Sequence, residues 1–200
     1  MNSDVSALIL AGGKATRFGG IAKHELVIAS PALPGEAAPP DGGAESIAGR
    51  SIFERQVAVL APRVVEIIVS GAAIAGYRSV RDQVESAGPL AGIAAGLAVI
   101  TDWLLVIAGD MPYLTGELVD SLIAARAPEL DAVGIRIGDL PEPLCCLLHA
   151  RTRETVDRRL AAGRFKASGL LTDEGLRVRW LTDADPAALR NLNSPSDLPR

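Results

Sequence analysis

Short apolar runs recur along this sequence at intervals that leave room for a helix between them. Residues 7–10, 64–69 and 104–107 are such runs, and they are typical of strands buried in a sheet. Two more runs, at residues 132–137 and 144–148, flank a Gly-Asp pair and predict neighbouring strands joined by a turn. Strands that alternate with helices predict an α/β fold in which helices cover a sheet.

Between the expected strands, apolar residues recur at the spacing of a helix. Ser51 and Glu54 have the spacing of a capping box, in which each side chain satisfies a backbone amide of the first helical turn. The helices expected from apolar spacing cover residues 53–60, 92–100, 117–125 and 152–162. We also expect a late strand at residues 177–181 and a short terminal helix after Ser194.

Residues 30–48 interrupt this pattern. The segment is rich in Pro, Gly and Ala and has almost no large apolar side chain, so burial cannot offset the entropy of ordering it. The 29 residues before it are too few to fold alone without disulfides or a metal. We therefore expect a single domain over residues 1–200, with a flexible insertion at about residues 30–48.

The composition excludes several classes of protein. The chain has 200 residues and is 48% hydrophobic, enough for a sizeable core. Its net charge is −4, whereas proteins that hold duplex nucleic acid or anionic membranes are usually basic. No apolar stretch approaches the roughly 20 residues of a membrane-spanning helix, and the first residues lack a signal-peptide pattern. We expect a soluble, cytoplasmic protein that binds neither nucleic acid nor membrane.

The cysteines and histidines indicate neither a disulfide framework nor a zinc site. Cys145 and Cys146 are adjacent and cannot close a useful loop, which favours a reducing compartment. With His149 they lie in an apolar run, so we expect them in the core. His24 is the one remaining histidine, which leaves no His/Cys cluster for zinc.

The first strand runs into a glycine-rich segment at residues 12–20, followed by Lys23. Glycines allow backbone amides to approach a ligand closely, and Lys14, Arg17 and Lys23 supply positive charge, a combination that suits a polyphosphate. The segment matches neither the P-loop nor the G-x-G-x-x-G pattern. A tight turn with solvated cations is the alternative, although ligands do bind at the carboxyl ends of α/β strands.

Asp110 directly follows a buried strand, between Gly109 and Pro112. We expect its carboxylate at the same edge of the sheet as the glycine-rich segment, where Mg²⁺ would bridge it to phosphate oxygens. An aspartate that only forms a turn before a proline is the alternative.

Two more segments offer ligand contacts. Residues 88–92 (GPLAG) combine a turn with a helix start, where glycine lets a base or phosphate approach; a simple strand–helix joint is the alternative. Residues 191–195 (NLNSP) place two amides before a capped helix. Such asparagines usually satisfy local backbone, but one of the two is also a candidate metal ligand.

Taken in order, these motifs resemble the molybdenum cofactor guanylyltransferase family. They are LAGG at 10–13, Arg17, Gly19, Gly20, Lys23, GPLAG at 88–92, GDMP at 109–112, Glu142-Pro143 and NLNSP at 191–195. The resemblance covers nearly the whole chain and implies a Rossmann-like, doubly wound mixed sheet with helices on both faces, of the nucleotide-diphospho-sugar transferase type. It also implies transfer of GMP from GTP to molybdenum-molybdopterin, with Mg²⁺ and release of diphosphate. Delivery proteins and molybdoenzymes would be further partners.

The resemblance assigns roles to the matched residues. Those that would bind the nucleotide are Leu10, Ala11, Gly12, Gly13, Lys23, Ser70, Asp82, Gly88, Pro89, Leu90 and Asp110. Arg17, Lys23 and Asp110 would be catalytic, with the two cations neutralising the departing diphosphate. Asp110 and Asn193 would hold the metal. No general base is expected, because the acceptor phosphate is already an anionic nucleophile.

Three departures from the family pattern keep alternatives open. Ala22 stands where an acid usually precedes the lysine, Ser70 stands where asparagine is frequent, and the insertion is longer than usual. The first two motivate a nucleotide-binding regulatory protein without turnover. A cytidylyltransferase is a second alternative, although such relatives tend to carry LAAG in place of LAGG. A sugar-nucleotide pyrophosphorylase is disfavoured, because the Lys-Pro expected in its loop is absent after Lys23.

Overall fold

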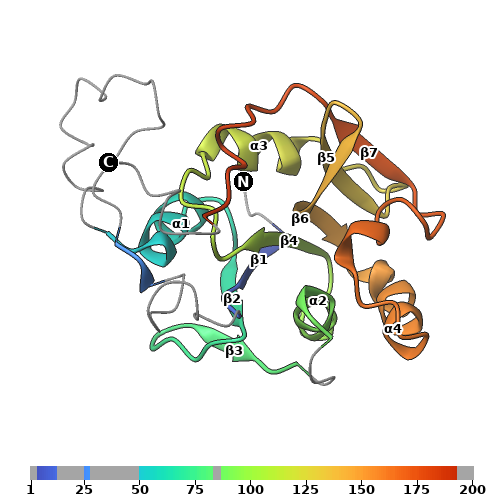
Figure 1. Ribbon diagram of the computed structural model, residues 1–200, viewed down its shortest axis with the longest axis horizontal. Helices are drawn as coiled ribbons and strands as arrows, with labels where there is room; N and C mark the ends of the chain where they lie inside the picture. Colours follow the sequence, from blue (N-terminus) through green and yellow to red (C-terminus); the bar gives the residue numbers. More distant parts are fainter. Residues whose placement is uncertain (1–3, 13–24, 28–49, 83–86, 193–200) are drawn as a thin grey trace.

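A seven-stranded sheet forms the centre of the molecule in a computed structural model, which describes residues 4–12, 25–27, 50–82 and 87–192. Its strands are β1 (Val5–Leu10), β2 (Glu66–Ser70), β3 (Arg78–Val80), β4 (Trp103–Ala108), β5 (Ala132–Ile137), β6 (Leu140–His149) and β7 (Val178–Leu181). They lie in the order β3-β2-β1-β4-β6-β5-β7 (Figure 1). All strands but β6 run in the same direction, so the sheet is mixed, as expected.

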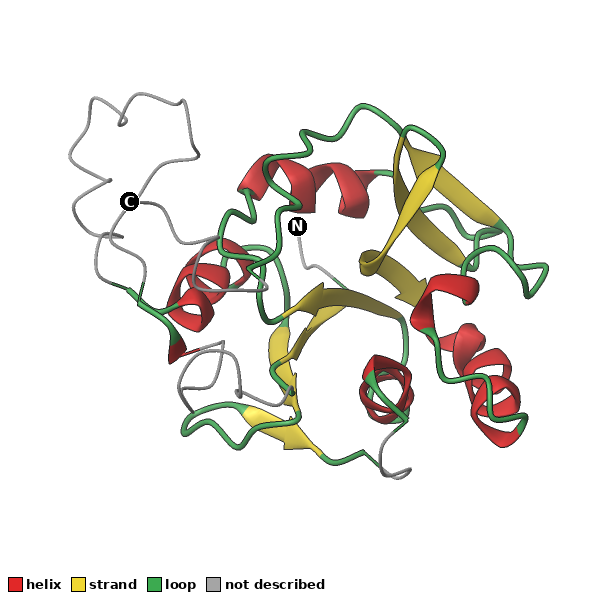
Figure 2. Cartoon of the chain, viewed as in Figure 1, coloured by secondary structure: helices red, strands yellow, loops and turns green. Residues whose placement is uncertain are grey.

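Helices cover both faces of this sheet. They are α1 (Ile52–Leu60), α2 (Pro89–Leu97), α3 (Gly116–Ala124) and α4 (Arg153–Ala161). Side chains of α1 and α3 pack on one face and those of α2 and α4 on the other, as the ribbons show (Figures 1 and 2). The predicted doubly wound α/β fold is confirmed.

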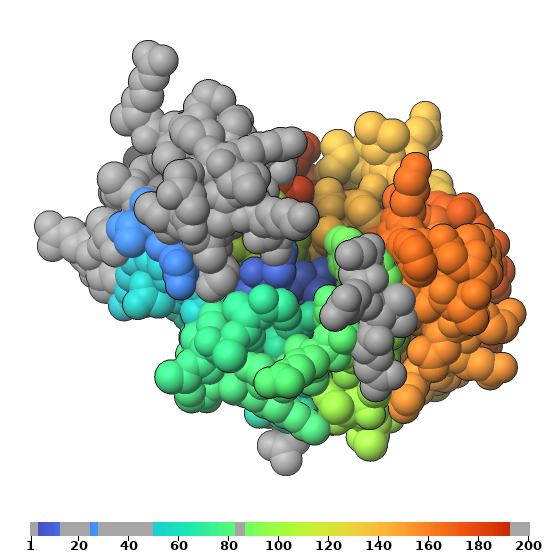
Figure 3. Space-filling view, turned by 60° about the horizontal axis from the view of Figure 1, so that its bottom comes forward, coloured from blue at the N-terminus to red at the C-terminus, as the bar shows by residue number. Residues whose placement is uncertain are grey.

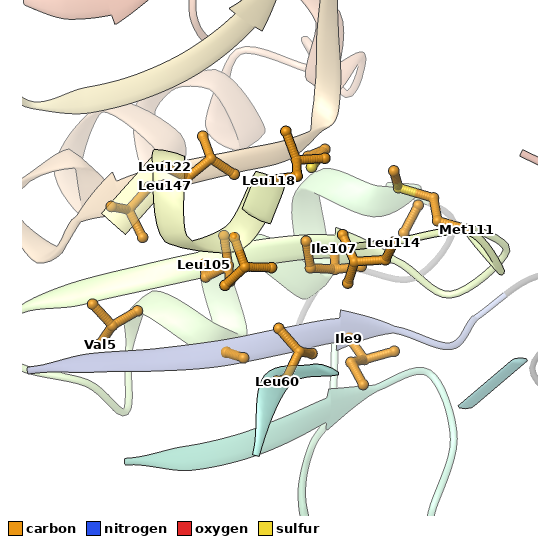
Figure 4. Close-up of a cluster of buried hydrophobic side chains, with 14 of the residues drawn as sticks. Val5, Ile9, Leu60, Leu105, Ile107, Met111, Leu114, Leu118, Leu122 and Leu147 are labelled. Carbon is orange, nitrogen blue, oxygen red and sulfur yellow. The ribbon is translucent and has the colours of Figure 1, made fainter. Parts of the chain in front are cut away.

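The two faces of β1 explain why its sequence is apolar at nearly every position. Val5, Ala7 and Ile9 join the cluster under α1 and α3, whereas Leu8 joins the cluster under α2. Successive strand residues point to opposite faces, and a strand buried on both faces reads as a continuous apolar run. Figure 4 shows the first cluster, in which Val5 and Ile9 lie near Leu60 of α1.

Several local expectations are confirmed. In the capping box, the Ser51 N–H donates to Glu54 Oε2 (2.7 Å) and the Glu54 N–H donates to Ser51 Oγ (3.2 Å). The β5–β6 turn contains Gly138 at φ 59°. Cys145 and Cys146 are fully buried, as expected.

Other expectations were wrong in detail. The helix expected at residues 92–100 is α2, which begins at Pro89 because proline suits the first helical position, and it ends at Leu97. The strand expected at residues 64–69 begins only at Glu66. Strand β3 was not expected, because its three largely polar residues show no alternation of apolar and polar side chains. The insertion and the terminal helix after Ser194 lie outside the described residues.

Candidate nucleotide site

The carboxyl ends of β1, β2 and β4 meet at one edge of the sheet. Leu10, the last residue of β1, is level with Ser70 of β2 on one side and with Ala108 of β4 on the other. The chain leaves β1 for β2 on one side and later returns to β4 on the other. This change of direction is the switch point at which α/β sheets bind ligands.

The loops after these strands touch backbone to backbone. A Cβ on Gly71, which has φ +85°, would lie 2.4 Å from Gly12 Cα, and a Cβ on Gly109 would lie 2.6 Å from the Leu10 oxygen. The Ala11 N–H donates to the Ser70 oxygen (2.8 Å), and the Gly109 N–H donates to the Leu10 oxygen (3.0 Å). The glycines are therefore needed for the three loops to approach each other, whatever ligand they hold.

Ser70 and Asp82 form the polar pair of this edge. The Ser70 hydroxyl donates to Asp82 Oδ1 (2.9 Å), and Ser70 itself is only 3% exposed. A Cβ on Gly92 of α2 would lie 2.6 Å from Ser70 Oγ and 2.8 Å from a Leu10 methyl carbon, so the helix packs directly on both residues. The structure thus brings together Leu10, Ser70 and Asp82, three of the residues predicted to bind the nucleotide.

The start of α2 faces the same edge. Gly88 precedes the helix at φ 64°, Pro89 occupies its first turn, and the Leu90 side chain is fully buried. No side chain caps this end, and the amino end of a helix carries partial positive charge. Of the three residues predicted to contact the nucleotide, Gly88 and Pro89 are exposed on the surface, whereas Leu90 anchors the helix in the core.

Asp110 lies in the turn after β4, and two distant segments hold that turn. The buried Gln56 of α1 donates from Nε2 to the oxygens of Ala108 (2.7 Å) and Met111 (3.1 Å). The Leu192 N–H donates to the Asp110 oxygen (2.9 Å), so the chain that leads to Asn193 passes beside Asp110. The role of Gln56 was missed, because its partners lie more than 50 residues further along the chain.

Glu142, near the start of β6, is a second carboxylate close to Asp110. Burial raises the pKa of Glu142, and the negative charge of Asp110 raises it further, against a hydrogen bond from the Leu144 N–H. The register pairs Ile107 of β4 with Cys145 of β6, which brings Glu142 level with the turn after β4. The sequence placed Glu142 in a motif but indicated no role for it.

This pair suits a divalent cation of the Mg²⁺ type. Such an ion usually binds one or two protein carboxylates and completes its shell with water and substrate phosphates. Within the described ranges no group of three or more His, Cys, Asp or Glu residues is placed to hold a metal by itself. The carboxylates of Asp110 and Glu142 therefore fit a cation that arrives with a phosphate-bearing substrate.

Four predicted site residues cannot be placed. Gly13, Arg17, Lys23 and Asn193 lie outside the described residues, so their roles stay predictions.

A separate groove is bordered by residues of α1 and of the segment that follows β2. It has a volume of about 1010 Å³, and its lining includes Phe53 of α1 together with Ile74 and Tyr77. None of its described lining residues is a predicted site residue. A different hollow is visible in Figure 3, where dark-blue residues of the β1 region lie between the green and the yellow-to-orange parts of the chain.

The sequence profile of the MobA-like NTP transferase domain matches residues 43–185. The chain belongs to the MobA-like NTP transferase family. Family membership makes it a nucleotidyltransferase, as the motifs predicted.

Known proteins are similar to this MobA-like chain over nearly its full length. The molybdenum cofactor guanylyltransferase of Serratia proteamaculans is 29% identical, with 98% of this chain and 93% of the relative covered. Among solved structures, molybdopterin-guanine dinucleotide biosynthesis protein A from Archaeoglobus fulgidus has a TM-score of 0.71 at 21% identity, covering 96% of this chain and 94% of that one. The 2-C-methyl-D-erythritol 4-phosphate cytidylyltransferase of Thermus thermophilus has a TM-score of 0.63 at 15% identity, covering 96% and 94%. The predicted fold type is confirmed.

Proposed function

We propose that this chain transfers GMP from GTP to molybdenum-molybdopterin, forming molybdopterin guanine dinucleotide and releasing diphosphate. One observation carries the proposal: Leu10, Ser70 and Asp82 meet the turn of Asp110 at the switch point of the sheet. The relatives that match over the whole length, named molybdenum cofactor guanylyltransferases, support this choice of substrates.

The nucleotide would lie over β1, β2 and the start of α2. Ser70 fixes one oxygen of the Asp82 carboxylate, and the other oxygen has no hydrogen bond from a described residue. A carboxylate only accepts hydrogen bonds, so Asp82 suits the N–H groups of guanine or the ribose hydroxyls. The exposed amino end of α2 favours negative charge nearby, which suits the phosphates.

Asp110 would hold Mg²⁺, with Asn193 as a second ligand and Glu142 adding negative charge. When bound, the cation neutralises charge on the polyphosphate. Gln56 holds the turn so that the Asp110 side chain stays at the edge. Arg17 and Lys23 would attract the departing diphosphate. The acceptor phosphate needs no base, because it is already an anion.

The proposal is tested by diphosphate release from the purified chain with molybdenum-molybdopterin, Mg²⁺ and, in parallel, GTP, CTP or ATP. Release that needs the acceptor and is fastest with GTP supports the proposal. Release that is fastest with CTP would indicate a cytidylyltransferase. Nucleotide binding without release, followed by thermal unfolding, would indicate the regulatory protein.

A further inference from the structure

Arg136 is a partly buried arginine near the end of β5 whose charge has no acidic partner within the described chain. Its guanidinium carbon lies 4.2 Å from the ring centroid of Trp180, and its Nε is buried without a hydrogen-bond partner. Arg159 also has a buried Nε without a partner, but its guanidinium pairs with Glu174 (2.6 Å), and that of Arg177 pairs with Asp131 (2.9 Å). Buried donors are normally satisfied, so the position of Arg136 needs an explanation.

The local chain is built to keep Arg136 in this position. The Trp180 ring, from β7, lies across Gly134 of β5, where a Cβ would come within 2.6 Å of the ring. Arg136 follows on the same strand and stacks on that ring. A stacked guanidinium keeps its plane fixed while its edge remains able to donate hydrogen bonds to an anion.

Arg136 belongs to the edge of the sheet that carries the nucleotide site. Strand β5 runs parallel to β1 and β4, so its carboxyl end reaches the same edge. One strand, β6, lies between β4 and β5, so these two strands are roughly 10 Å apart across the sheet. In the register, Arg136 is level with Pro141 of β6.

The in-line geometry of the transfer reaction indicates which substrate lies on this side of the edge. An oxygen of the acceptor phosphate bonds to the α-phosphorus of GTP while the bond from that phosphorus to the diphosphate oxygen breaks, and the groups lie roughly in line. The nucleotide occupies the β1–β2–α2 side of Asp110. The acceptor must then extend over the β6–β5 side, where Arg136 lies.

We propose that Arg136, stacked on Trp180, binds the acceptor substrate, a pterin phosphate. Its guanidinium attracts this anionic compound and aligns its phosphate with the nucleotide. The inference rests on the proposed function for the identity of the acceptor, but its binding test does not require transfer to occur.

The experiment compares the parent with Arg136→Met, which keeps most of the contact with Trp180 but removes the charge. Arg153→Met is the matched control, because Arg153 is an exposed arginine of α4 paired with Asp157 (3.6 Å). We expect Arg136→Met to raise KM for molybdenum-molybdopterin about tenfold or more. KM for GTP and kcat at saturating acceptor should stay within about twofold, and Arg136→Lys should restore part of the loss.

Binding without turnover is measured by the fluorescence anisotropy of neopterin monophosphate, with no nucleotide present. We expect Arg136→Met to weaken this binding by about tenfold, while Arg153→Met leaves it unchanged. Thermal unfolding checks that each variant is folded. Arg136→Gln is a second neutral variant in case Arg136→Met does not fold.

The two proposals fail in different ways. Parental KM values and parental pterin binding in the neutral variants would overturn the role of Arg136 and leave GMP transfer standing. Failure of the parent to bind neopterin monophosphate, together with an unchanged acceptor KM, would also overturn it. Binding that depends on Arg136 in a chain that releases no diphosphate from GTP would instead support Arg136 and refute GMP transfer.

Discussion

Asp110 shows how much one site residue depends on distant neighbours. The buried side-chain amide of Gln56 donates to the backbone oxygens of Ala108 and Met111, which lie on either side of Asp110 in the sequence. The Leu192 N–H donates to the backbone oxygen of Asp110 itself. None of these contacts uses the Asp110 carboxylate. A change of its side chain therefore leaves these three hydrogen bonds in place.

We predict that Asp110→Asn lowers diphosphate release by about a hundredfold or more, the scale of losing one electrostatic contributor at a transition state. Asparagine keeps the shape but loses the negative charge. The measurement is diphosphate release across a Mg²⁺ titration. Asp139→Asn, at the exposed β5–β6 turn, is the matched control. Near-parental turnover at limiting Mg²⁺ would refute the assignment, and an unfolded variant would favour a purely structural Asp110.

At the scale of elements, a comparison of Gly71 with Gly76 distinguishes the effect of backbone strain from the effect of close contact between two loops. Both have φ +85°, but only Gly71 faces another backbone, that of Gly12, whereas nothing lies within 4 Å of a Cβ on Gly76. We predict that Gly76→Ala costs about 1 kcal/mol of unfolding free energy and leaves nucleotide affinity unchanged.

Gly71→Ala should cost about 1–3 kcal/mol more, because overpacking adds to the strain, and it should weaken nucleotide binding by moving the loop after β1. Urea denaturation and GTP titration measure the two effects. Equal losses of stability for both variants would mean that the loops do not need to touch.

The junction of β5 and β7 gives a pH-dependent prediction. The pKa of Asp131 is lowered chiefly by side-chain hydrogen bonds from Arg177, including Nη2 to Oδ1 (2.9 Å). A carboxyl whose pKa is depressed on folding stabilises the protein above its unfolded pKa of about 4, and this is lost as pH falls through the folded value. Asp131→Asn should therefore lower the urea midpoint at pH 7, and the gap to the parent should close below about pH 4. A gap that stays constant with pH would contradict this.

The helices and strands that could be predicted are those with a recognisable pattern in their own residues. β1 and β4 are buried on both faces and read as apolar runs, and the capping box identifies the start of α1. β3 could not be predicted, because its three residues pair only at the sheet edge. Leu10, Ser70 and Asp82 were found through the motif resemblance. Gln56 and Glu142 were not, because their roles arise from contacts between segments far apart in the sequence.

At the scale of the whole molecule, the insertion at about residues 30–48 remains a prediction. The chain just before and after it is joined, since Val27 and Ser51 form an antiparallel bridge. A short Gly-Ser connection can therefore span the gap. We predict that replacing residues 30–48 in this way leaves the melting temperature nearly unchanged, because the segment has little apolar surface to bury. A large drop in differential scanning calorimetry would show that the segment is packed.

Strand β6 runs against every other strand, so its beginning, not its end, reaches the edge of the candidate nucleotide site. The hairpin turn at Gly138 and the register shift between Val133 and Ile135 together set the level of Glu142 on β6 relative to β5. Side chains alternate along a strand, so a slip of one residue would turn Glu142 to the opposite face, whereas a slip of two would only displace it. Redesign of this hairpin should therefore shift β6 in even steps, since an odd step would turn the Glu142 carboxylate to the opposite face of the sheet.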